Sequence, residues 1–187
     1  MQTADVVVIG AGINGASTAY NLAKRGAGSV VLIEKQLLAS GGTGRSAAIV
    51  RQHYSSEELV KMVRRSVEIF DHFDDEVGGE CGFTNTGWAF LVPQDVSDGL
   101  SANLEMGQRL GVDVREISRE DLLELEPRLE LGDVHRVAYE PGSGYADPRA
   151  TTHSYVRRFV ELGGQLKQLC AVTGLQLEGD GIAGVET

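Results

Sequence analysis

The fold is decided by the stretch Asp5-Val6-Val7-Val8-Ile9-Gly10-Ala11-Gly12-Ile13-Asn14-Gly15, followed by a helix-like run to Arg25 and then by Val30-Val31-Leu32-Ile33-Glu34. Each β-branched run is typical of a strand that is buried on both faces of a parallel sheet. Small apolar residues recur at helical spacing between the two runs, and Gly26 favours a helix end. A strand, a helix and a strand within about 30 residues predict a βαβ unit.

The glycines of this stretch have the spacing G-x-G-x-x-G, at the point where the strand should pass into the helix. A tight turn at Gly10 and an open backbone at Gly12 suit a pyrophosphate, and Gly15 lets the helix pack against the strand. Glu34 follows about 20 residues later, where an acid binds a ribose hydroxyl pair and disfavours a 2′-phosphate. A lone glycine motif is a weak signal, but this context predicts a dinucleotide site for either NAD or FAD.

Composition and charge limit the class of protein. Of the 187 residues, 42% are apolar and 24% are charged, which is typical of a soluble globular protein with a substantial core. The net charge of −10 disfavours sequence-independent binding to nucleic acid or to an anionic membrane, because both need a basic surface. No apolar run approaches the ~18 residues of a membrane span. We therefore expect neither a nucleic acid nor a membrane as partner.

The N-terminus and the cysteines favour a cytoplasmic location. The first predicted strand begins almost at the start of the chain, which leaves no room for a signal or transit peptide. Cys81 and Cys170 have the spacing of neither a metal site nor a disulfide framework, so we expect free thiols. His72, His135 and His153 share no metal-like spacing with acids or cysteines. The sequence therefore predicts no metal site.

The composition changes after Glu34, because residues 38–48 are rich in glycine and small hydroxyl residues and show no periodicity. A surface loop is one interpretation. The other is that the backbone N–H groups, hydroxyls and single arginine of this segment wrap phosphates and the polar edge of a ring system.

Together, this loop and the glycine motif resemble a known family. Two motifs are similar to those of the FAD-dependent D-amino-acid oxidase (DAO) superfamily. The first is formed by residues 10–15 with Glu34, and the second is Ser40-Gly41-Gly42-Thr43-Gly44-Arg45-Ser46-Ala47-Ala48-Ile49-Val50-Arg51-Gln52-His53-Tyr54. Within that superfamily they resemble the branch of sarcosine oxidase β subunits and dimethylglycine dehydrogenase. The resemblance implies FAD rather than NAD. It also implies an α/β fold, in which a Rossmann-type FAD-binding βαβ domain carries an inserted α+β substrate domain and is incomplete at the C-terminus.

The resemblance further implies which residues contact the cofactor. In the family, the loop after the second strand runs past the FAD pyrophosphate and beneath the flavin ring, and a later strand brings backbone to the adenine. The implied cofactor-binding residues are Gly10, Gly12, Ile13, Asn14, Gly15, Glu34, Lys35, Ser40, Thr43, Gly44, Arg45, Ser46, Ala47 and Val172.

Arg51 is the candidate catalytic residue. It matches the arginine with which the family holds the substrate carboxylate, and a planar guanidinium directly after a strand-like Ile-Val pair suits bidentate carboxylate binding. A structural ion pair is the alternative role. Ala48 stands where monomeric sarcosine oxidases have a second, catalytic arginine, so their mechanism cannot be transferred whole.

Two groups near Arg51 have alternative interpretations. His53 could orient substrate or carry a proton, but a hydrogen-bonded structural histidine is the favoured role. Trp88, Phe90 and Tyr139 could face a substrate, although aromatic residues on strands usually fill cores.

The pattern after this segment predicts a long helix, opened by a capping box of Ser55 and Glu58 and ended by Gly78-Gly79. Its predicted core stripe is Leu59, Val63, Val67, Phe70, Phe73 and Val77. The acidic residues at 71 and 74–76 are interpreted as a solvated helix face rather than a metal site.

From Cys81 onward the pattern becomes α+β. Strands are expected over 88–92, 112–117, 134–139 and 166–172, helices over 97–110, after Ser118 and from Asp147-Pro148, and a hairpin over 174–185 that turns at 179–181. The domains expected are therefore an FAD-binding part over 1–80, part of the substrate domain over 81–146, and a return to the FAD-binding domain over 147–187.

The expected function is FAD-dependent oxidation of the C–N bond of a small N-methyl amino acid, by hydride transfer to the flavin with Arg51 holding the carboxylate. A hydroxy acid fits the same arginine nearly as well. The alternative from a different class is a non-catalytic FAD-binding module, and an NAD-linked dehydrogenase is a distant third. Family members normally continue for nearly as long again. The chain is therefore either a fragment of a longer protein or one whose fold is completed by a second copy or a partner chain, and unpaired strand edges would favour such association.

Overall fold

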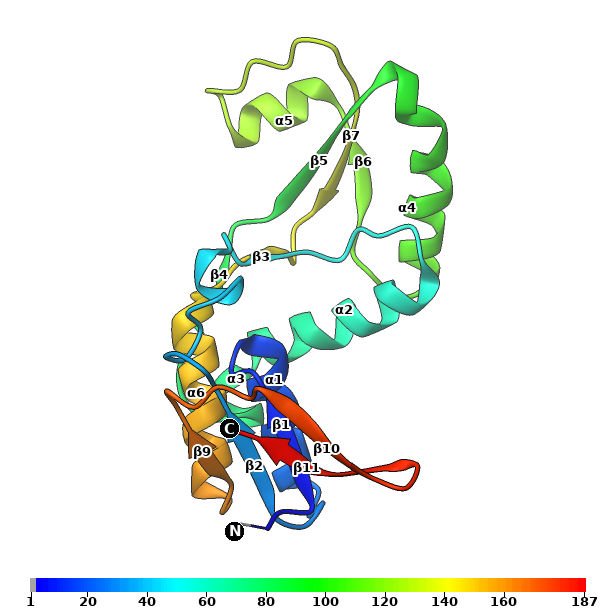
Figure 1. Cartoon of the computed structure of the whole chain (residues 1–187). Coiled ribbons are helices and arrows are strands. Elements are labelled where there is room, and N and C mark those ends of the chain that lie inside the picture. Colours follow the sequence, from blue (N-terminus) through cyan, green and yellow to red (C-terminus); the bar gives the residue numbers. More distant parts are fainter. Residues whose placement is uncertain (1–2) are drawn as a thin grey trace. The chain divides into compact units, whose positions relative to one another are not determined.

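The computed structural model describes residues 3–187, apart from the side chain of Val96. The chain forms two compact units. Unit 1 contains residues 3–48, 73–82 and 147–187, and unit 2 contains residues 49–72 and 83–146 (Figure 1). Residues 49–72 group with unit 2 by their contacts, whereas the sequence assigned them to the FAD-binding part. The functional division at 80 and 146 remains a prediction.

Unit 1 is built on a parallel sheet in the order β1-β2-β9, formed by β1 (Val6–Ile9), β2 (Val30–Ile33) and β9 (Gln165–Lys167). The first two strands pair from Val6 with Val30 to Ile9 with Ile33. Helices α1 (Ile13–Lys24) and α6 (Pro148–Glu161) pack against each other and against this sheet (Figure 1). The predicted βαβ unit is confirmed.

The two N-terminal strands differ in burial. Every residue of β2 is buried, whereas Val7 and Ile9 of β1 are 36% and 55% exposed. The prediction that β1 is buried on both faces is therefore wrong. β1 is an edge strand, and a groove remains between the face that carries Val7 and the hairpin of β10 (Gly174–Glu178) and β11 (Gly181–Glu186). The predicted hairpin itself is confirmed.

The cap and the aromatic contacts of α6 fix its position in unit 1. Asp147 Oδ1 accepts two backbone N–H groups of the first turn at 2.8 and 2.9 Å, and Pro148 occupies the first helical position, as predicted. Tyr155 of α6 packs against Tyr20 of α1 and against Phe73 of α3 (Phe73–Glu76), with ring centroids 5.4 Å apart in both pairs. This packing holds α1, and so the loop that precedes it.

Unit 2 contains an antiparallel sheet in the order β5-β7-β6, formed by β5 (Trp88–Pro93), β7 (Val134–Glu140) and β6 (Arg115–Ile117). Hydrophobic residues pack on both of its faces. One buried cluster joins Val92 and Ala138 to residues of α4 (Leu100–Arg109), which follows the short helix η2 (Gln94–Gly99). The other joins Val137 to Leu122 of α5 (Arg119–Leu125), whose start has the capping box of Ser118 and Asp121.

A second, smaller sheet of unit 2 positions the segment that carries Arg51. Its order is β3-β8-β4, formed by β3 (Ile49–Val50), β8 (Gly144–Tyr145) and β4 (Thr84–Asn85). Val50, Val67 and Ala146 form a buried cluster beside it. Because Arg51 follows β3 directly, this short pairing positions the backbone from which the Arg51 side chain extends.

Helix α2 (Glu57–Asp71) differs from its prediction at both ends. Its N-cap is Ser56, whose side chain makes no capping hydrogen bond, so the predicted capping box of Ser55 and Glu58 is wrong. The helix ends before His72 rather than near Val77, because Phe73 leaves it to join the aromatic core of unit 1. Leu59 was expected in the core but is 43% exposed, because its neighbour Val60 takes the buried position.

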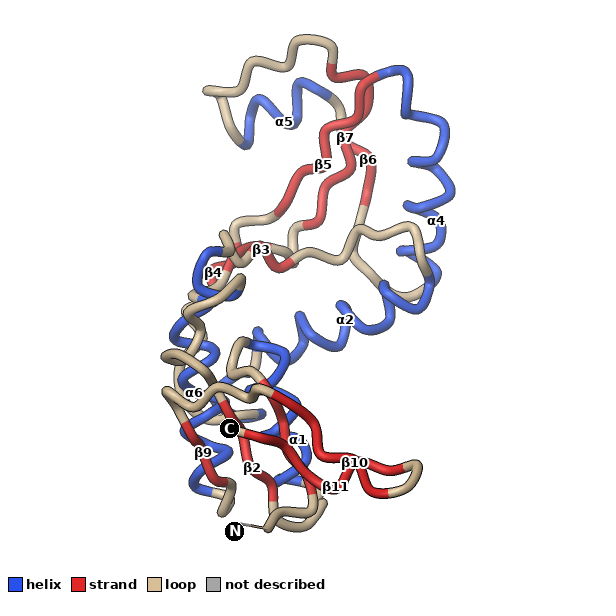
Figure 2. Tube along the Cα trace, in the orientation of Figure 1, coloured by secondary structure: helices blue, strands red, loops and turns tan. Residues whose placement is uncertain are grey.

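Three further predicted elements are shorter than expected. β9 ends at Lys167, before Val172, because Leu169 has a φ of +55° and the backbone leaves the sheet. The expected strand over 112–117 is reduced to β6, and the expected helix over 97–110 begins as η2. Figure 2 shows little regular structure between β2 and β3, as predicted for the loop, apart from the short helix η1 (Thr43–Arg45). None of the helices within residues 3–187 has the length and hydrophobicity that a bilayer crossing requires.

Candidate functional site

The glycine loop after β1 is a tight turn that accepts no larger residue at one position. The Gly10 N–H donates to the Ile33 carbonyl at 2.7 Å, and Gly10 has a φ of +96°, which favours glycine. A Cβ at Gly15 would lie 1.8 Å from the Gly10 carbonyl oxygen. The first turn of α1 therefore packs directly on the loop, as the glycine spacing predicted.

The N-terminus of α1 presents backbone donors. Gly12 is the N-cap, and the helical ladder begins with the Ala16 N–H, which donates to the Gly12 carbonyl at 2.9 Å. Before that point, the Ile13 N–H donates to Thr43 Oγ1 at 3.0 Å. The N–H groups of Asn14 and Gly15 have no carbonyl within the helix to receive them, and the helix dipole adds positive potential there. This end of α1 suits a phosphate group.

Glu34, which directly follows β2, also holds the glycine loop in place through its side chain. Its Oε2 accepts the Ala11 N–H and its Oε1 accepts the Gln36 N–H, both at 2.8 Å. The backbone of Glu34 also receives the Cys170 N–H at 3.0 Å, which brings the segment after β9 alongside. Each carboxylate oxygen can accept more than one hydrogen bond, so ribose hydroxyls can still bind.

The second loop is tied to the first. Thr43 contacts the start of α1, and a Cβ at Gly12 would lie 2.9 Å from Thr43 Oγ1. The Ala39 N–H donates to the Ala11 carbonyl at 3.1 Å, and the Gly44 N–H donates to the Ala39 carbonyl at 2.9 Å. The structure therefore brings together Gly10, Gly12, Ile13, Gly15, Glu34, Thr43 and Gly44 through direct contacts. Backbone donors for phosphates beside a carboxylate for a ribose fit a dinucleotide.

The other predicted cofactor residues of unit 1 make fewer contacts. Lys35, Arg45, Ser46 and Ala47 are exposed, while the half-buried Ser40 donates through its hydroxyl to the Leu37 carbonyl at 2.6 Å. Val172 is half-buried in the segment after β9. Their role in binding a cofactor remains a prediction.

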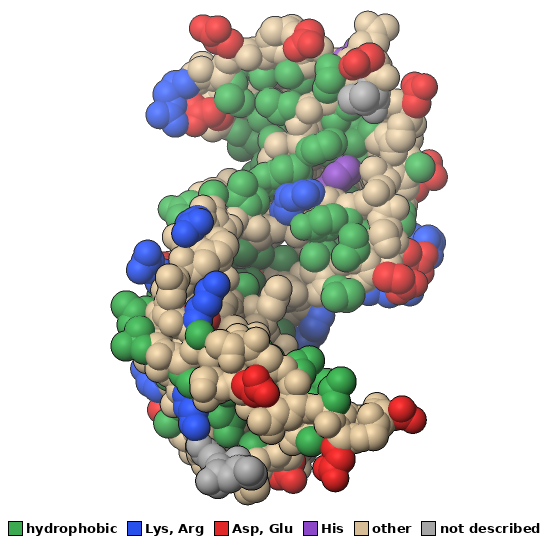
Figure 3. Space-filling model, viewed as in Figure 1, with side chains coloured by type: hydrophobic (Ala, Val, Ile, Leu, Met, Phe, Trp, Pro, Cys, Tyr) green, Lys and Arg blue, Asp and Glu red, His purple; other side chains and the backbone are tan. Residues whose placement is uncertain are grey.

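Arg51 belongs to unit 2 and lies among aromatic rings. Its guanidinium carbon lies 4.3 Å from the ring centroid of Tyr54 and 5.0 Å from that of Trp88, and Nη1 donates to the His53 carbonyl. Within residues 3–187 no carboxylate lies within ion-pair distance of Arg51. Over the part of the surface that contains β5 and β7, Figure 3 shows hydrophobic side chains grouped around a basic side chain and a histidine. Aromatic support and unused donors suit a guanidinium that binds an external anion.

His53 is buried but does not have the predicted structural hydrogen bond. Its Nε2 has no partner among the described residues, and its ring stacks on Phe90 with centroids 4.8 Å apart. Burial lowers the pKa of His53 below its ordinary value, and the Arg51 charge lowers it further. His53 is therefore a ring-stacked core residue whose burial disfavours its charged form.

Sequence reasoning missed Glu140, which is fully buried at the end of β7. Its Oε2 accepts the Gln52 N–H at 2.8 Å and the Ser143 hydroxyl at 2.7 Å, while its Oε1 has no hydrogen-bond partner in the described part of the chain. Burial raises the pKa of Glu140, against the opposing effect of these two hydrogen bonds and of Arg51. In sequence it resembles an ordinary acid before the turn that starts at Pro141, so no local signal marks it.

The three aromatic residues considered for the substrate side lie on different faces. Trp88 pairs with Glu140 and Phe90 with Ala138, and the two rings stack 5.5 Å apart. Because side chains alternate along a strand, Tyr139 points to the opposite face of the sheet. Only Trp88 and Phe90 therefore share the face of Arg51.

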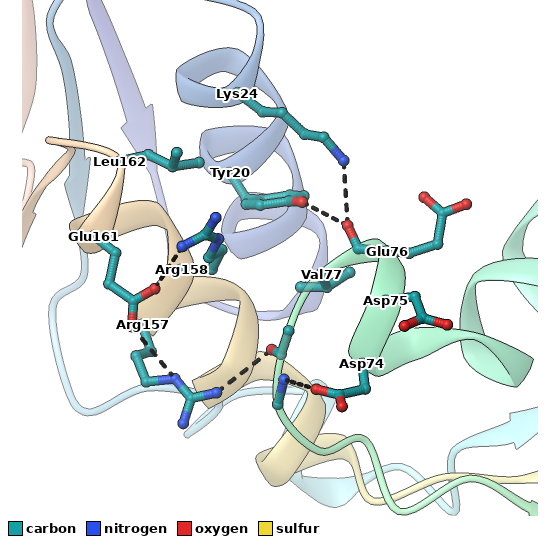
Figure 4. A pocket seen from close by; sticks show the side chains of 12 residues that line it. Tyr20, Lys24, Asp74, Asp75, Glu76, Val77, Arg157, Arg158, Glu161 and Leu162 are labelled. Atoms are coloured by element: carbon teal, nitrogen blue, oxygen red, sulfur yellow. Dashed lines mark hydrogen bonds and ion pairs between the residues drawn. The ribbon is translucent and has the colours of Figure 1, made fainter.

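A separate polar groove in unit 1 contains none of the predicted site residues. Figure 4 shows Tyr20 and Lys24 both directed at the Glu76 carbonyl, at 2.8 and 3.2 Å. Arg157 lies between Glu161 and the Gly78 carbonyl. Its acids and bases are interleaved, which does not favour a ligand of either charge. In residues 3–187, no three metal-type ligands come together.

The glycine loop provides a matched pair of substitutions. Gly15→Ala should lower the free energy of unfolding by roughly 2–4 kcal/mol, because its Cβ meets backbone that cannot move freely. Gly41→Ala in the second loop has open space around it and should change stability by less than about 0.5 kcal/mol. Urea unfolding of the two variants measures the difference, and equal stability would contradict the close approach of α1 to the loop.

The buried histidine predicts a pH dependence. Because the folded-state pKa of His53 is lowered, the unfolded chain binds more protons below an ordinary pKa near 6.5, and stability should fall as the pH falls through that value. Between about pH 7.5 and 5.5, the free energy of unfolding of the native chain should fall by up to about 1.4 kcal/mol more than that of His53→Phe. His135→Phe, at an exposed site on β7, is the control and should keep the native pH dependence. Parallel losses in the native chain and His53→Phe would show that His53 titrates normally.

The chain matches a known family over nearly its whole length. The match is to the DAO family, described as FAD dependent oxidoreductase, over residues 5–187. Mitochondrial sarcosine dehydrogenase of Mus musculus is 31% identical over 100% of this chain, and sarcosine oxidase subunit beta of Arthrobacter sp is 30% identical over 98% of it. The crystal structure of L-proline dehydrogenase from P. horikoshii is 33% identical over 98% of this chain, with a TM-score of 0.90.

The chain spans about half of the subunit and of the crystallised chain, 47% and 49%, and 21% of the mitochondrial enzyme. These matches confirm the predicted resemblance, the α/β fold class and FAD as the cofactor of the family. The chain belongs to the DAO family of FAD-dependent oxidoreductases.

Proposed function

We propose that this chain is the FAD-holding part of an oxidoreductase that oxidises the C–N bond of a small N-methyl amino acid by transfer of a hydride to the flavin. Membership of the DAO family supports FAD-dependent redox chemistry. Two relatives are named as a sarcosine dehydrogenase and as a subunit of sarcosine oxidase, and sarcosine is N-methylglycine. FAD, when bound, supplies the two-electron acceptor.

The observation that carries this proposal is the environment of Arg51. Two aromatic rings and the His53 carbonyl hold the guanidinium, and no acid within residues 3–187 neutralises it at ion-pair distance. A planar guanidinium with unused donors binds a carboxylate through two parallel hydrogen bonds. Such a contact fixes the orientation of an amino acid, and orientation is the main contribution that the protein makes to flavin chemistry.

In unit 1, the residues that would hold FAD are already in contact with one another. The N–H groups at the start of α1 would bind the pyrophosphate, and Glu34 would accept the ribose hydroxyls. Thr43 joins the second loop to this site.

A second candidate function is a cofactor-holding module that is inactive until another polypeptide contributes to the site. One relative favours it, since the Arthrobacter protein is named as a subunit, beta, of sarcosine oxidase. A hydroxy acid in place of the amino acid remains a further proposal for the substrate. The cytoplasmic location and a second copy or partner chain likewise remain predictions.

The colour of the purified protein and its response to N-methylglycine test the function. The protein should be yellow, and N-methylglycine added without oxygen should bleach the flavin absorbance. Bound FAD that no amine or hydroxy acid reduces would favour the cofactor-holding module. A colourless protein that takes up no added FAD would contradict both candidates.

Removal of the guanidinium tests the substrate contact. Arg51→Met keeps an unbranched side chain beside the two rings. It should raise the KM for N-methylglycine strongly, because a charged contact that contributes about 2–4 kcal/mol to the free energy of substrate binding is lost. Arg115→Met is the matched control, because Arg115 lies 5.7 Å from the Tyr139 ring in the same unit and should leave KM unchanged. Equal kinetics for Arg51→Met and the native chain would remove Arg51 from the substrate site.

A further inference from the structure

We infer that Glu140 is a positioning residue, which holds the backbone that carries Arg51 so that the guanidinium faces its carboxylate ligand. This inference rests on the proposed role of Arg51. Glu140 is fully buried and closes β7, far along the sequence from Arg51. It does not touch the ligand in this proposal, and it acts through the residue after Arg51.

The first support is a hydrogen bond to the backbone of the arginine segment. Glu140 Oε2 accepts the Gln52 N–H at 2.8 Å, and Gln52 directly follows Arg51. Within residues 3–187, the only strand pairing next to Arg51 is that of the two-residue strand β3 with β8. Such a short pairing holds the following residues weakly, so the carboxylate provides the missing anchor.

The second support is that the same carboxylate is tied to the aromatic ring beneath Arg51. Glu140 is the register partner of Trp88 across β5 and β7. Its Oε2 also accepts the Ser143 hydroxyl at 2.7 Å, and the Ser143 carbonyl accepts the Gly87 N–H at 2.8 Å, one residue before Trp88. One buried group therefore sets the position of both the guanidinium and its aromatic support.

The third support is what Glu140 does not bind. It makes no ion pair with Arg51 within residues 3–187, although the two charges are close enough to influence each other. An acid placed directly on Arg51 would occupy the donors that a substrate carboxylate needs. Binding the backbone instead leaves those donors available. A buried carboxyl with one oxygen unpaired in the described part of the chain is costly, and core packing alone does not explain its presence there.

Trp88 provides a readout that needs no turnover, because it is the single tryptophan of the chain and its ring lies 5.0 Å from the Arg51 guanidinium carbon. Acetate is titrated into the FAD-loaded protein while Trp88 fluorescence is recorded, and methylamine, which lacks a carboxylate, serves as the control ligand. Glu140→Gln keeps an oxygen acceptor and should bind acetate within about threefold of the native chain. Glu140→Met keeps the volume but removes the acceptor, and should weaken acetate binding at least about tenfold.

The KM for N-methylglycine should rise in Glu140→Met with kcat changed much less, whereas general loss of structure would lower both binding and kcat. Glu116→Gln, which removes a charge from the same sheet at its ion pair with Arg136, is the matched control and should behave as the native chain. If Glu140→Met does not fold, Ser143→Ala provides the second test. It should weaken acetate binding about two- to fivefold, because Glu140 loses one of its two fixed partners.

The outcomes separate this inference from the proposed function. If the native chain does not bind acetate, or if Arg51→Met binds acetate as tightly as the native chain does, then Arg51 does not bind a carboxylate. The proposed function then fails as well. If the native chain binds acetate, Arg51→Met does not, and Glu140→Met or Ser143→Ala binds as tightly as the native chain, only the positioning role of Glu140 is overturned. Equal losses in Glu140→Gln and Glu140→Met would also overturn it, since charge rather than hydrogen bonding would then be responsible.

Discussion

The hydrogen bond between the Glu34 carboxylate and the Ala11 N–H is the constraint on which unit 1 depends. It joins the end of β2 to the glycine loop after β1 at 2.8 Å. The second loop is added through Thr43, which receives the Ile13 N–H, so the two loops and the start of α1 form one connected structure. A charge-assisted bond to a backbone N–H is stronger than a neutral one, and it keeps the loop in place before any cofactor arrives. The acid that we propose to bind the ribose therefore also fixes the glycine loop that we propose to bind the phosphates.

Unit 2 contains a similar interaction, in which a carboxylate accepts a backbone N–H group. There a buried carboxylate, Glu140, receives the backbone N–H next to Arg51, while the guanidinium itself is held by Tyr54 and Trp88. In both units an acid fixes backbone so that another group is left available for a ligand. Among the described residues no acid forms an ion pair with Arg51, which leaves its donors available for the proposed substrate carboxylate.

Much of this structure could be predicted from local patterns in the sequence. The βαβ unit, the cap at Asp147 and the hairpin after Gly174 follow from glycine spacing, capping chemistry and alternation, which act within a few residues. The failures involve contacts between distant segments. The exposure of Ile9 depends on what covers the sheet, and the break after α2 depends on Phe73 packing against Tyr155.

The candidate site shows the same division. Gly10, Gly15 and Glu34 could be assigned because a short motif fixes their geometry. Glu140 could not, since its importance arises only when β7 folds against the segment after β3. The hydrogen bond expected for His53 is absent among the described residues, because its ring stacks on Phe90 and its Nε2 meets no polar partner.

The central claim is that Glu34 and the two loops form a preorganised site for FAD. The most direct test is a titration of the native chain and of Glu34→Ala with FAD, followed by the change in flavin fluorescence. The account predicts that Glu34→Ala raises the dissociation constant for FAD at least about tenfold, because both the ribose acceptor and the anchor of the glycine loop are lost. An unchanged dissociation constant would contradict it.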